Sequence, residues 1–293
     1  MISVSRLTGE VKQLAWKDAA QNAGDVIWVA RDGSPRILLA TQKSVYTNEV
    51  GFWPHVIDVD VSTGKTKEVV ASAENVLDHY ADASGAVRVA YGYNDANRTG
   101  KLLYRSSGKG YFKVVDRASF AKDEGLAFPS LFLPEPDKAL TSDASDGYEA
   151  LYELDLTTMT RGKRIFGVPG YDIGGLIKNP AGDAIMGVYV TENRSRIHWF
   201  DPEMAKTQSD IDTAVGAGKS RIVSWDRNFQ KLLVKVGNAD QAGAYFIYDR
   251  VRGGVMQRVG FADASLKMLK MAPVTTIKYK ARDDLEISAV LTL

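Results

Sequence analysis

Two aspartates, Asp58 and Asp60, have a spacing that could do chemistry, because paired carboxylates act as acid and base in glycoside hydrolysis. At i and i+2 on one strand, both side chains would lie on the same face. However, aspartate returns at the corresponding place later in the chain, at Asp155, Asp201 and Asp249. A carboxylate that recurs beside turns typically accepts backbone N–H groups. We therefore interpret these aspartates as turn residues.

A serine nucleophile would need the Gly-x-Ser-x-Gly pattern, in which small flanking residues permit a strained turn. Four serines have glycine on one side only, namely Ser62, Ser106, Ser145 and Ser220. No serine has glycine at both positions. The sequence therefore predicts no nucleophile elbow, although a dispersed triad that uses His55 or His79 is left open.

Metal and cofactor sites have little support in the sequence. It contains no cysteine and only three histidines, His55, His79 and His198, and no two of them have the spacing of metal ligands. His198 alternates with apolar neighbours and is expected to be a structural hydrogen-bonding residue. We expect no metal site and no cofactor.

Residues 216–220, Gly-Ala-Gly-Lys-Ser, look like part of a phosphate-binding loop. That loop needs a further glycine where this chain has Thr213, and it must open a helix. Here the apolar run that starts at Arg221 predicts a strand. We interpret the segment as a loop between repeats.

The charge balance argues against nucleic acid as a partner, and the hydropathy argues against a membrane. The sequence has 37 basic and 36 acidic residues and a formal net charge of +1, without the basic surplus that phosphate binding uses. Apolar stretches such as residues 184–190 are far shorter than the roughly 20 residues that span a bilayer. We expect a soluble protein, cytoplasmic or periplasmic, and homo-oligomers are left open.

Short apolar runs that flank polar turns recur along the chain and predict β-hairpins, as at residues 26–40. A second type of hairpin recurs more regularly, and its aligned positions are Ser5, Asp60, Arg105, Asp155, Asp201 and Asp249. Their spacings are 55, 45, 50, 46 and 48 residues. A repeat of roughly 45–50 residues with four short strands per unit is typical of β-propeller blades.

The predicted fold is therefore an all-β propeller of four-stranded blades, with five whole blades and a partial one. The partial blade comes first, because the chain starts at Ile2 almost directly in an outer strand. Blades pack face to face because one sheet cannot bury both of its faces alone. A parallel α/β sheet would need longer helical segments between the strands than this pattern offers.

The chain after Phe261 departs from the repeat. Residues 262–271 include Leu266, Met268 and Leu269 and are expected to form a short linking helix before Pro273. The final residues predict two strands joined by a polar turn at Arg282-Asp283-Asp284.

This ending resembles the opening of the α/β-hydrolase domain in the prolyl oligopeptidase family of serine peptidases, in its acylaminoacyl-peptidase and dipeptidyl-aminopeptidase-like branch. The matching residues are Lys280-Ala281-Arg282-Asp283, Leu285-Glu286-Ile287 and Leu291-Thr292-Leu293. Asp284 stands where the family usually has glycine, and Val290 where it often has tyrosine. Residues 81–88 and 147–152 also resemble the propeller of that branch.

The resemblance implies a propeller over residues 1–261, N-terminally incomplete, a linker over 262–273, and the opening strands of a missing hydrolase domain over 274–293. In that family the catalytic Ser, Asp and His lie in the hydrolase domain, so the resemblance implies that they would lie beyond Leu293. It therefore implies a non-catalytic propeller that gates access of peptide substrates, which would bind through the hydrolase domain. The sequence does not identify which propeller residues contact the substrate, although loop residues such as Arg98 are candidates.

Two other classes are left open. A stand-alone propeller that binds a protein or ligand would be closed if residues 277–293 paired with residues 2–15, because this would remove an open sheet edge. A five-bladed glycosidase or lactonase-like enzyme would need carboxylates from several blades to converge at the axis.

Overall fold

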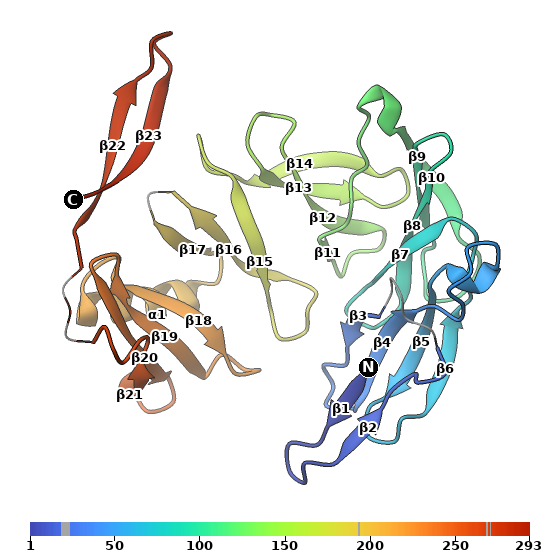
Figure 1. Ribbon diagram of the computed structural model, residues 1–293, viewed down its shortest axis with the longest axis horizontal. Helices are drawn as coiled ribbons and strands as arrows, with labels where there is room; N and C mark the ends of the chain where they lie inside the picture. Colours follow the sequence, from blue (N-terminus) through green and yellow to red (C-terminus); the bar gives the residue numbers. More distant parts are fainter. Residues whose placement is uncertain (19–23, 193, 268, 270) are drawn as a thin grey trace. The chain divides into compact units, whose positions relative to one another are not determined.

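The computed structural model describes residues 1–18, 24–192, 194–267, 269 and 271–293. It is built mainly of antiparallel β-sheets, which are coloured along the chain in Figure 1. The chain divides into two compact units. The first holds residues 1–170 and 181–185, and the second holds residues 171–180 and 186–293.

The first unit has, within its described residues, one two-stranded hairpin and three four-stranded sheets. The hairpin consists of β1 (Ile2–Val4) and β2 (Val11–Gln13). The first sheet contains β3 (Asp25–Val29), β4 (Arg36–Thr41), β5 (His55–Asp60) and β6 (Thr66–Val70). The second contains β7 (Val76–Ala81), β8 (Val87–Asn94), β9 (Thr99–Tyr104) and β10 (Lys113–Ser119). The third contains β11 (Leu131–Phe132), β12 (Lys138–Asp143), β13 (Ala150–Asp155) and β14 (Thr160–Phe166). Two short 3₁₀ helices are Val50–Phe52 and Phe120–Lys122.

In each of these sheets the strands are neighbours in the order of the sequence. Such four-stranded antiparallel meanders are the blades of a β-propeller. The predicted blade architecture is confirmed, and the hairpin expected at residues 26–40 is present as β3–β4.

Consecutive sheets of the first unit bury their apolar faces against one another. Leu38 and Val56 of the first sheet form one buried cluster with Val87 of the second. Leu102 of the second sheet and Leu154 of the third belong to another, and both are fully buried. This is the face-to-face packing that makes each blade depend on its neighbour.

The second unit contains one three-stranded sheet, one helix, one four-stranded sheet and a C-terminal hairpin among the described residues. The first sheet is formed by β15 (Ile173–Lys178), β16 (Ile185–Thr191) and β17 (Ser195–Trp199), and helix α1 (Pro202–Val215) follows it. The second sheet is formed by β18 (Ser220–Trp225), β19 (Lys231–Asn238), β20 (Gln241–Asp249) and β21 (Val255–Phe261). The hairpin consists of β22 (Val274–Lys280) and β23 (Glu286–Thr292).

Helix α1 lies where the repeat predicted another outer hairpin around Asp201, so that prediction is wrong. The chain leaves β17 at Trp199, and the Asp201 carboxylate then caps the helix by accepting a hydrogen bond from the Met204 N–H at 2.8 Å. Pro202 occupies the first turn, where its missing N–H costs nothing. Met204 and Ile211, about two turns apart, are fully buried in the core cluster of this unit. The fifth repeat thus has three strands and a helix in place of a fourth strand.

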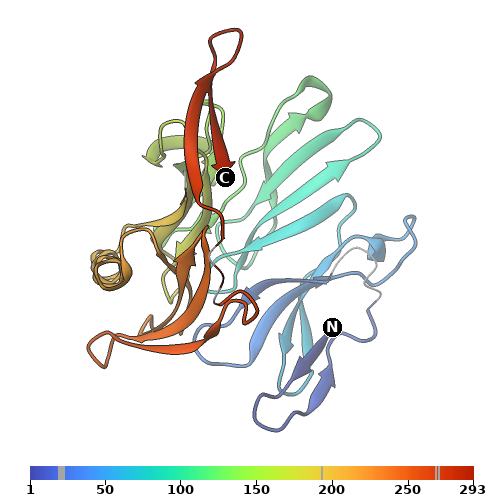
Figure 2. The ribbon, with the colours of Figure 1, turned by 60° about the vertical axis from the view of Figure 1, so that its left-hand side comes forward.

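The C-terminal hairpin has the two strands and the polar turn that the sequence predicts, and it projects beyond the β18–β21 sheet in Figures 1 and 2. Asp284 adopts a left-handed φ of +62°, a conformation that aspartate tolerates better than most residues. β22 and β23 form a two-stranded sheet of their own, as do β1 and β2. The described residues between 262 and 273 form bends and turns rather than the expected linking helix, and Met268 lies outside the described residues.

Candidate functional site

The recurring aspartates serve the turns, as the sequence analysis expects. Asp60 Oδ1 accepts hydrogen bonds from the backbone N–H and the hydroxyl of Ser62, at 2.8 and 2.6 Å. Asp155 does the same with Thr157, and these hydrogen bonds, from the Thr157 hydroxyl first, lower the pKa of Asp155 to about 2. Asp58, the other member of the supposed pair, forms an ion pair with Arg36. The two carboxylates therefore have separate structural partners.

His55 is buried and held by carboxylates on both sides of its ring. Its Nδ1 lies 2.9 Å from Glu68 Oε2, and its Nε2 lies 3.1 Å from Asp18 Oδ2. A triad histidine must keep one ring nitrogen for the proton of the nucleophile. Both nitrogens of His55 are occupied, so this geometry favours a structural role over a catalytic one.

The other two histidines lie on strands. His79 is buried on β7, its Nδ1 has no hydrogen-bond partner in the described part of the chain, and burial, with a smaller effect from the charge of Arg105, lowers its pKa to about 4. His198 lies on β17 and contacts the ring of Phe200 edge to face, with the ring centroids 5.1 Å apart. Among the described residues, no cluster of three or more His, Asp or Glu side chains could hold a metal ion.

The glycine-rich segment 216–220 joins α1 to β18. Gly216 ends the helix with a φ of +97°, and Ser220 begins the strand. The segment therefore leads into a strand and lacks the helix N-terminus that cradles phosphate.

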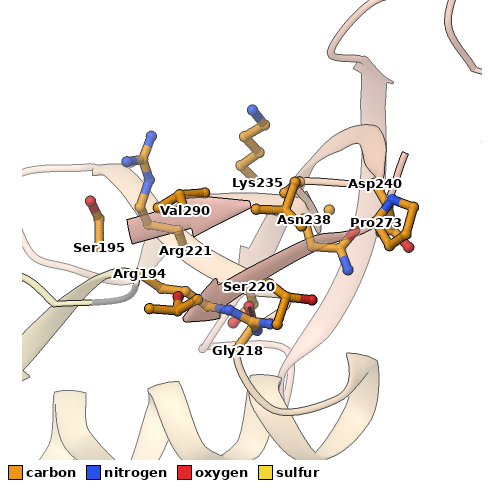
Figure 3. A pocket seen from close by; sticks show the side chains of 15 residues that line it. Arg194, Ser195, Gly218, Ser220, Arg221, Lys235, Asn238, Asp240, Pro273 and Val290 are labelled. Carbon is orange, nitrogen blue, oxygen red and sulfur yellow. Dashed lines mark hydrogen bonds between the residues drawn. The ribbon is translucent and has the colours of Figure 1, made fainter. Parts of the chain in front are cut away.

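A pocket of about 650 Å³ lies in the second unit, and Figure 3 shows its lining side chains. Its residues come mainly from the β16–β17 turn, the start of β18, the end of β19 with the β19–β20 turn, and the start of β22, with Val290 from β23. Within antiparallel blades, the start of the first strand and the turn between the second and third strands lie at the same end of the sheet. Blade topology therefore brings these distant segments together.

Three cations line the pocket, namely Arg194, Arg221 and Lys235, against one carboxylate, Asp240. Arg194 donates a hydrogen bond from Nη1 to the Gly218 carbonyl at 3.2 Å. Within the described part of the chain, no carboxylate lies at ion-pair distance from any of the three. The positive charge is thus available to an anionic ligand group.

Two buried acceptors line the same pocket without a donor. The side-chain Oδ1 atoms of Asn238 and Asp240 are both buried and make no hydrogen bond in the described structure. A buried acceptor without a donor costs free energy, roughly 1–3 kcal/mol. Figure 3 shows Asn238 and Asp240 toward one side of the pocket and Arg194 and Arg221 toward the other.

The pocket therefore offers cationic donors on one side and oxygen acceptors on the other. A peptide carries both complementary groups, since its N–H groups donate and its carboxylates accept. The chemistry available here is polar recognition of a ligand that carries both an anionic group and hydrogen-bond donors.

This pocket was not predicted from the sequence. The glycine-rich segment 216–220 contributes Gly218 and Ser220 to it, but the sequence indicated only a loop there. The three cations are far apart in the sequence, and a weak signal was available only in their positions, since Arg194 falls in one hairpin turn and Arg221 at the first residues of the next blade. Arg98, which the sequence left as a candidate contact, lies in the first unit in the β8–β9 turn, with a φ of +53°. Within the described residues, no helix combines the length and apolarity needed to cross a bilayer.

Comparison with known proteins places the fold. No protein-family model and no curated protein matches the sequence. Among solved structures, prolyl endopeptidases analysed for inter-domain dynamics match with a TM-score of 0.55 and 10% identity, over 98% of this chain and 42% of theirs. A puromycin-hydrolyzing peptidase of Mycobacterium tuberculosis matches with a TM-score of 0.55 and 11% identity, over 99% of this chain and 46% of its own.

Dipeptidyl peptidase 4 of Porphyromonas gingivalis matches with a TM-score of 0.51 and 11% identity, over 92% of this chain and 42% of its own. At such identities the similarity shows the fold alone. The predicted resemblance in fold to the propeller portion of prolyl oligopeptidase-type enzymes is confirmed. The chain spans less than half the length of these solved structures.

Proposed function

We propose that this chain is the substrate-gating propeller of a serine peptidase that acts on peptides, and that it is not catalytic on its own. The observation that carries this proposal is the extent of the fold match. Nearly the whole chain aligns with less than half of the chain of several peptidases. A propeller would restrict access to the active site of an adjacent hydrolase domain, since a narrow opening admits short or unfolded peptides and excludes folded proteins.

The pocket beside β22 supports a contact with peptides. Arg194 and Arg221 supply charge-assisted donors, and Asn238 and Asp240 supply acceptors that lack partners among the described residues. In this proposal the pocket holds part of the peptide while the reaction takes place on another domain.

The catalytic part of the proposal is tested by comparing the 293-residue protein with any longer product that its gene encodes. We expect no hydrolysis of fluorogenic di- to hexapeptide substrates by the former, and hydrolysis that a fluorophosphonate abolishes by the latter. Hydrolysis by the shorter protein would overturn the non-catalytic role. A longer product that binds peptides without cleaving them would favour a stand-alone binding propeller instead.

The pocket is tested with Arg221→Ala, measured as the Kd for an acidic hexapeptide by calorimetry. We expect a loss of affinity of about 10- to 100-fold, since a charge-assisted hydrogen bond contributes roughly 1.5–3 kcal/mol. Arg6→Ala, which removes the same charge from the exposed β1–β2 turn, is the matched control and should leave the Kd unchanged. Equal losses in both variants would indicate a general charge effect and remove the pocket from the proposal.

A further inference from the structure

The strand β17 is the edge of its sheet, and no described strand pairs with its outer side. In the four-stranded sheets this place belongs to the fourth strand, as where β14 pairs antiparallel with β13. In the fifth repeat the chain forms α1 instead. The backbone of β17 therefore keeps an open side, which is a template for another extended chain.

The register shows which backbone groups face that open side. The N–H of Phe200 donates to the Met186 carbonyl at 2.7 Å, so these two residues form a hydrogen-bonded pair. Pairs alternate along an antiparallel ladder, so Arg196 and His198 direct their backbone groups toward β16. Ile197 and Trp199 direct theirs toward the open side.

A groove of about 710 Å³ runs between this edge and α1. Residues 196–199 all line this groove. Alternate side chains of a strand lie on opposite faces of the sheet. All four residues can therefore line one groove only if the groove follows the edge of the strand. The helix contributes one short charged side chain, Asp212, and otherwise uncharged ones, namely Ala205, Gln208, Ser209 and Thr213, followed by Gly216 and Ala217. The side of the groove opposite β17 is thus not filled by long charged side chains of α1.

A second cavity of about 530 Å³ continues from this groove toward the pocket described above. It shares Arg196, Ile197 and Asp212 with the groove, and it shares Arg194 and Arg221 with the pocket. Both carboxylates of this cavity already have partners, since Glu192 pairs with Arg196 and Asp212 accepts hydrogen bonds from Gln208 and Ser220. Arg194 and Arg221 have no such carboxylate partner in the described part of the chain, so negative charge on a bound chain would be stabilised beside them.

We propose that the open edge of β17 binds an extended peptide by strand addition, in the place of the missing fourth strand, with an acidic group at the C-terminal end of the peptide. The other blades place the outer strand antiparallel to its neighbour, and the same pairing directs the C-terminal end of the peptide toward Ser195. There it reaches Arg194 and Arg221. The inference rests on the proposed peptide-binding role of this face and adds the mode of binding.

The probe is an N-acetylated heptapeptide of alternating threonine and valine that ends in aspartate, added to the intact protein and followed by calorimetry. Main-chain pairing dominates affinity in strand addition. We expect a measurable Kd for the unmodified peptide. A series of peptides then carries one N-methyl group each, and at every second position the group should weaken binding by about tenfold, since it removes one hydrogen bond of roughly 1.4 kcal/mol. N-methyl groups at the intervening residues should have little effect, because those N–H groups point away from β17.

Amidation of the C-terminus separates two sources of the negative charge. Weaker binding of the amide that retains the aspartate identifies the free carboxylate as the group held by the arginines, whereas unchanged binding assigns that contact to the aspartate side chain. Either result agrees with the proposal. Replacement of both acidic groups by neutral ones should cost about tenfold, and no loss would overturn the predicted orientation.

The variant Ile197→Pro removes one outward N–H and leaves the ladder to β16 intact, and we expect about a tenfold loss of affinity. If this variant does not fold, the N-methyl series on the unaltered protein decides alone. Binding that is sensitive to Arg221→Ala but indifferent to every N-methyl group would overturn strand addition and leave the proposed function standing. The inference is overturned if the probe fails to bind at millimolar concentration. It is also overturned if the protein forms a concentration-dependent dimer that excludes the peptide.

Discussion

The indole of Trp28 lies against the turn that contains Gly85, and its Nε1–H donates a hydrogen bond to the Ala83 carbonyl at 3.0 Å. Trp28 belongs to β3, whereas the turn joins β7 to β8 in the next sheet. Gly85 has a φ of +83°, and a Cβ atom at this position would lie 3.0 Å from carbons of the indole. The contact between two blades therefore requires glycine both for the backbone conformation and for the space.

We expect Gly85→Ala to lower the free energy of unfolding by about 2–3 kcal/mol, through the left-handed backbone and the crowding of Trp28. Urea denaturation measures the change. Gly33→Ala is the matched control, because Gly33 has a φ of +88° but no atom within 4 Å of the place that a Cβ would occupy. It should cost about 1 kcal/mol, the backbone part alone. Equal losses would contradict the role of the blade contact.

A hydrogen-bonded network also links the second and third sheets. The phenol of Tyr104 on β9 donates to the Asp137 carboxylate just before β12, and it accepts from Arg88 Nη2 at 2.6 Å. We expect Tyr104→Phe and Asp137→Asn to show a coupling of about 1 kcal/mol in a double-mutant cycle of unfolding free energies. Tyr104→Phe combined with Asp155→Asn, on a separate turn, should be additive. A coupling near zero in the first pair would count against the network.

The blade strands were predictable because their signal is local. Apolar runs and polar turns specify each hairpin within about 20 residues, as at Val26–Ala40, and the repeat of Asp60, Asp155 and Asp249 fixes the period. Helix α1 was missed because Asp201 occupies the same repeat position as those turn aspartates. At Asp201 the carboxylate caps a helix instead. Only Pro202 and the buried Met204 and Ile211, taken together, indicate a helix at this position.

The pocket could not be predicted for a different reason. Arg194, Arg221 and Asp240 are separated in sequence, and they meet because strand order and turn position place them at one end of the unit. Single charged residues near turns are ordinary surface residues in a sequence. Only the fold shows which of them share a cavity.

Acid pH should weaken the protein through His79. Its pKa is lowered from 6.5 to about 4, chiefly by burial, so the unfolded state binds more protons than the folded state between these values. The stability that the neutral ring contributes is present above pH 6.5 and is lost as the pH falls toward 4, in total about 3 kcal/mol. We expect His79→Leu to flatten the dependence of unfolding free energy on pH in this window. Identical slopes for the two proteins would refute the assignment to His79.

The cap of α1 makes a further prediction. Asp201→Ala should lower the free energy of unfolding by about 1 kcal/mol, because the Met204 N–H loses its acceptor. Asp201→Asn should restore most of the loss, since the amide oxygen can also cap a helix. As a control, Asp210→Ala removes only the exposed pair with Lys206 and should change stability by less than about 0.5 kcal/mol. Thermal unfolding followed by circular dichroism compares the three variants.

The aspartate turns have a consequence for how this chain reaches its native state. Several of them close within two residues, with one carboxylate oxygen accepting both the N–H and the hydroxyl of a following serine or threonine, at Asp32, Asp60, Asp82, Asp143 and Asp155. Contacts so close in sequence form before distant ones, and hairpins form within microseconds. During synthesis, each hairpin can thus be complete while the next blade is still inside the ribosome, and the sheets can assemble one after another from the N-terminus.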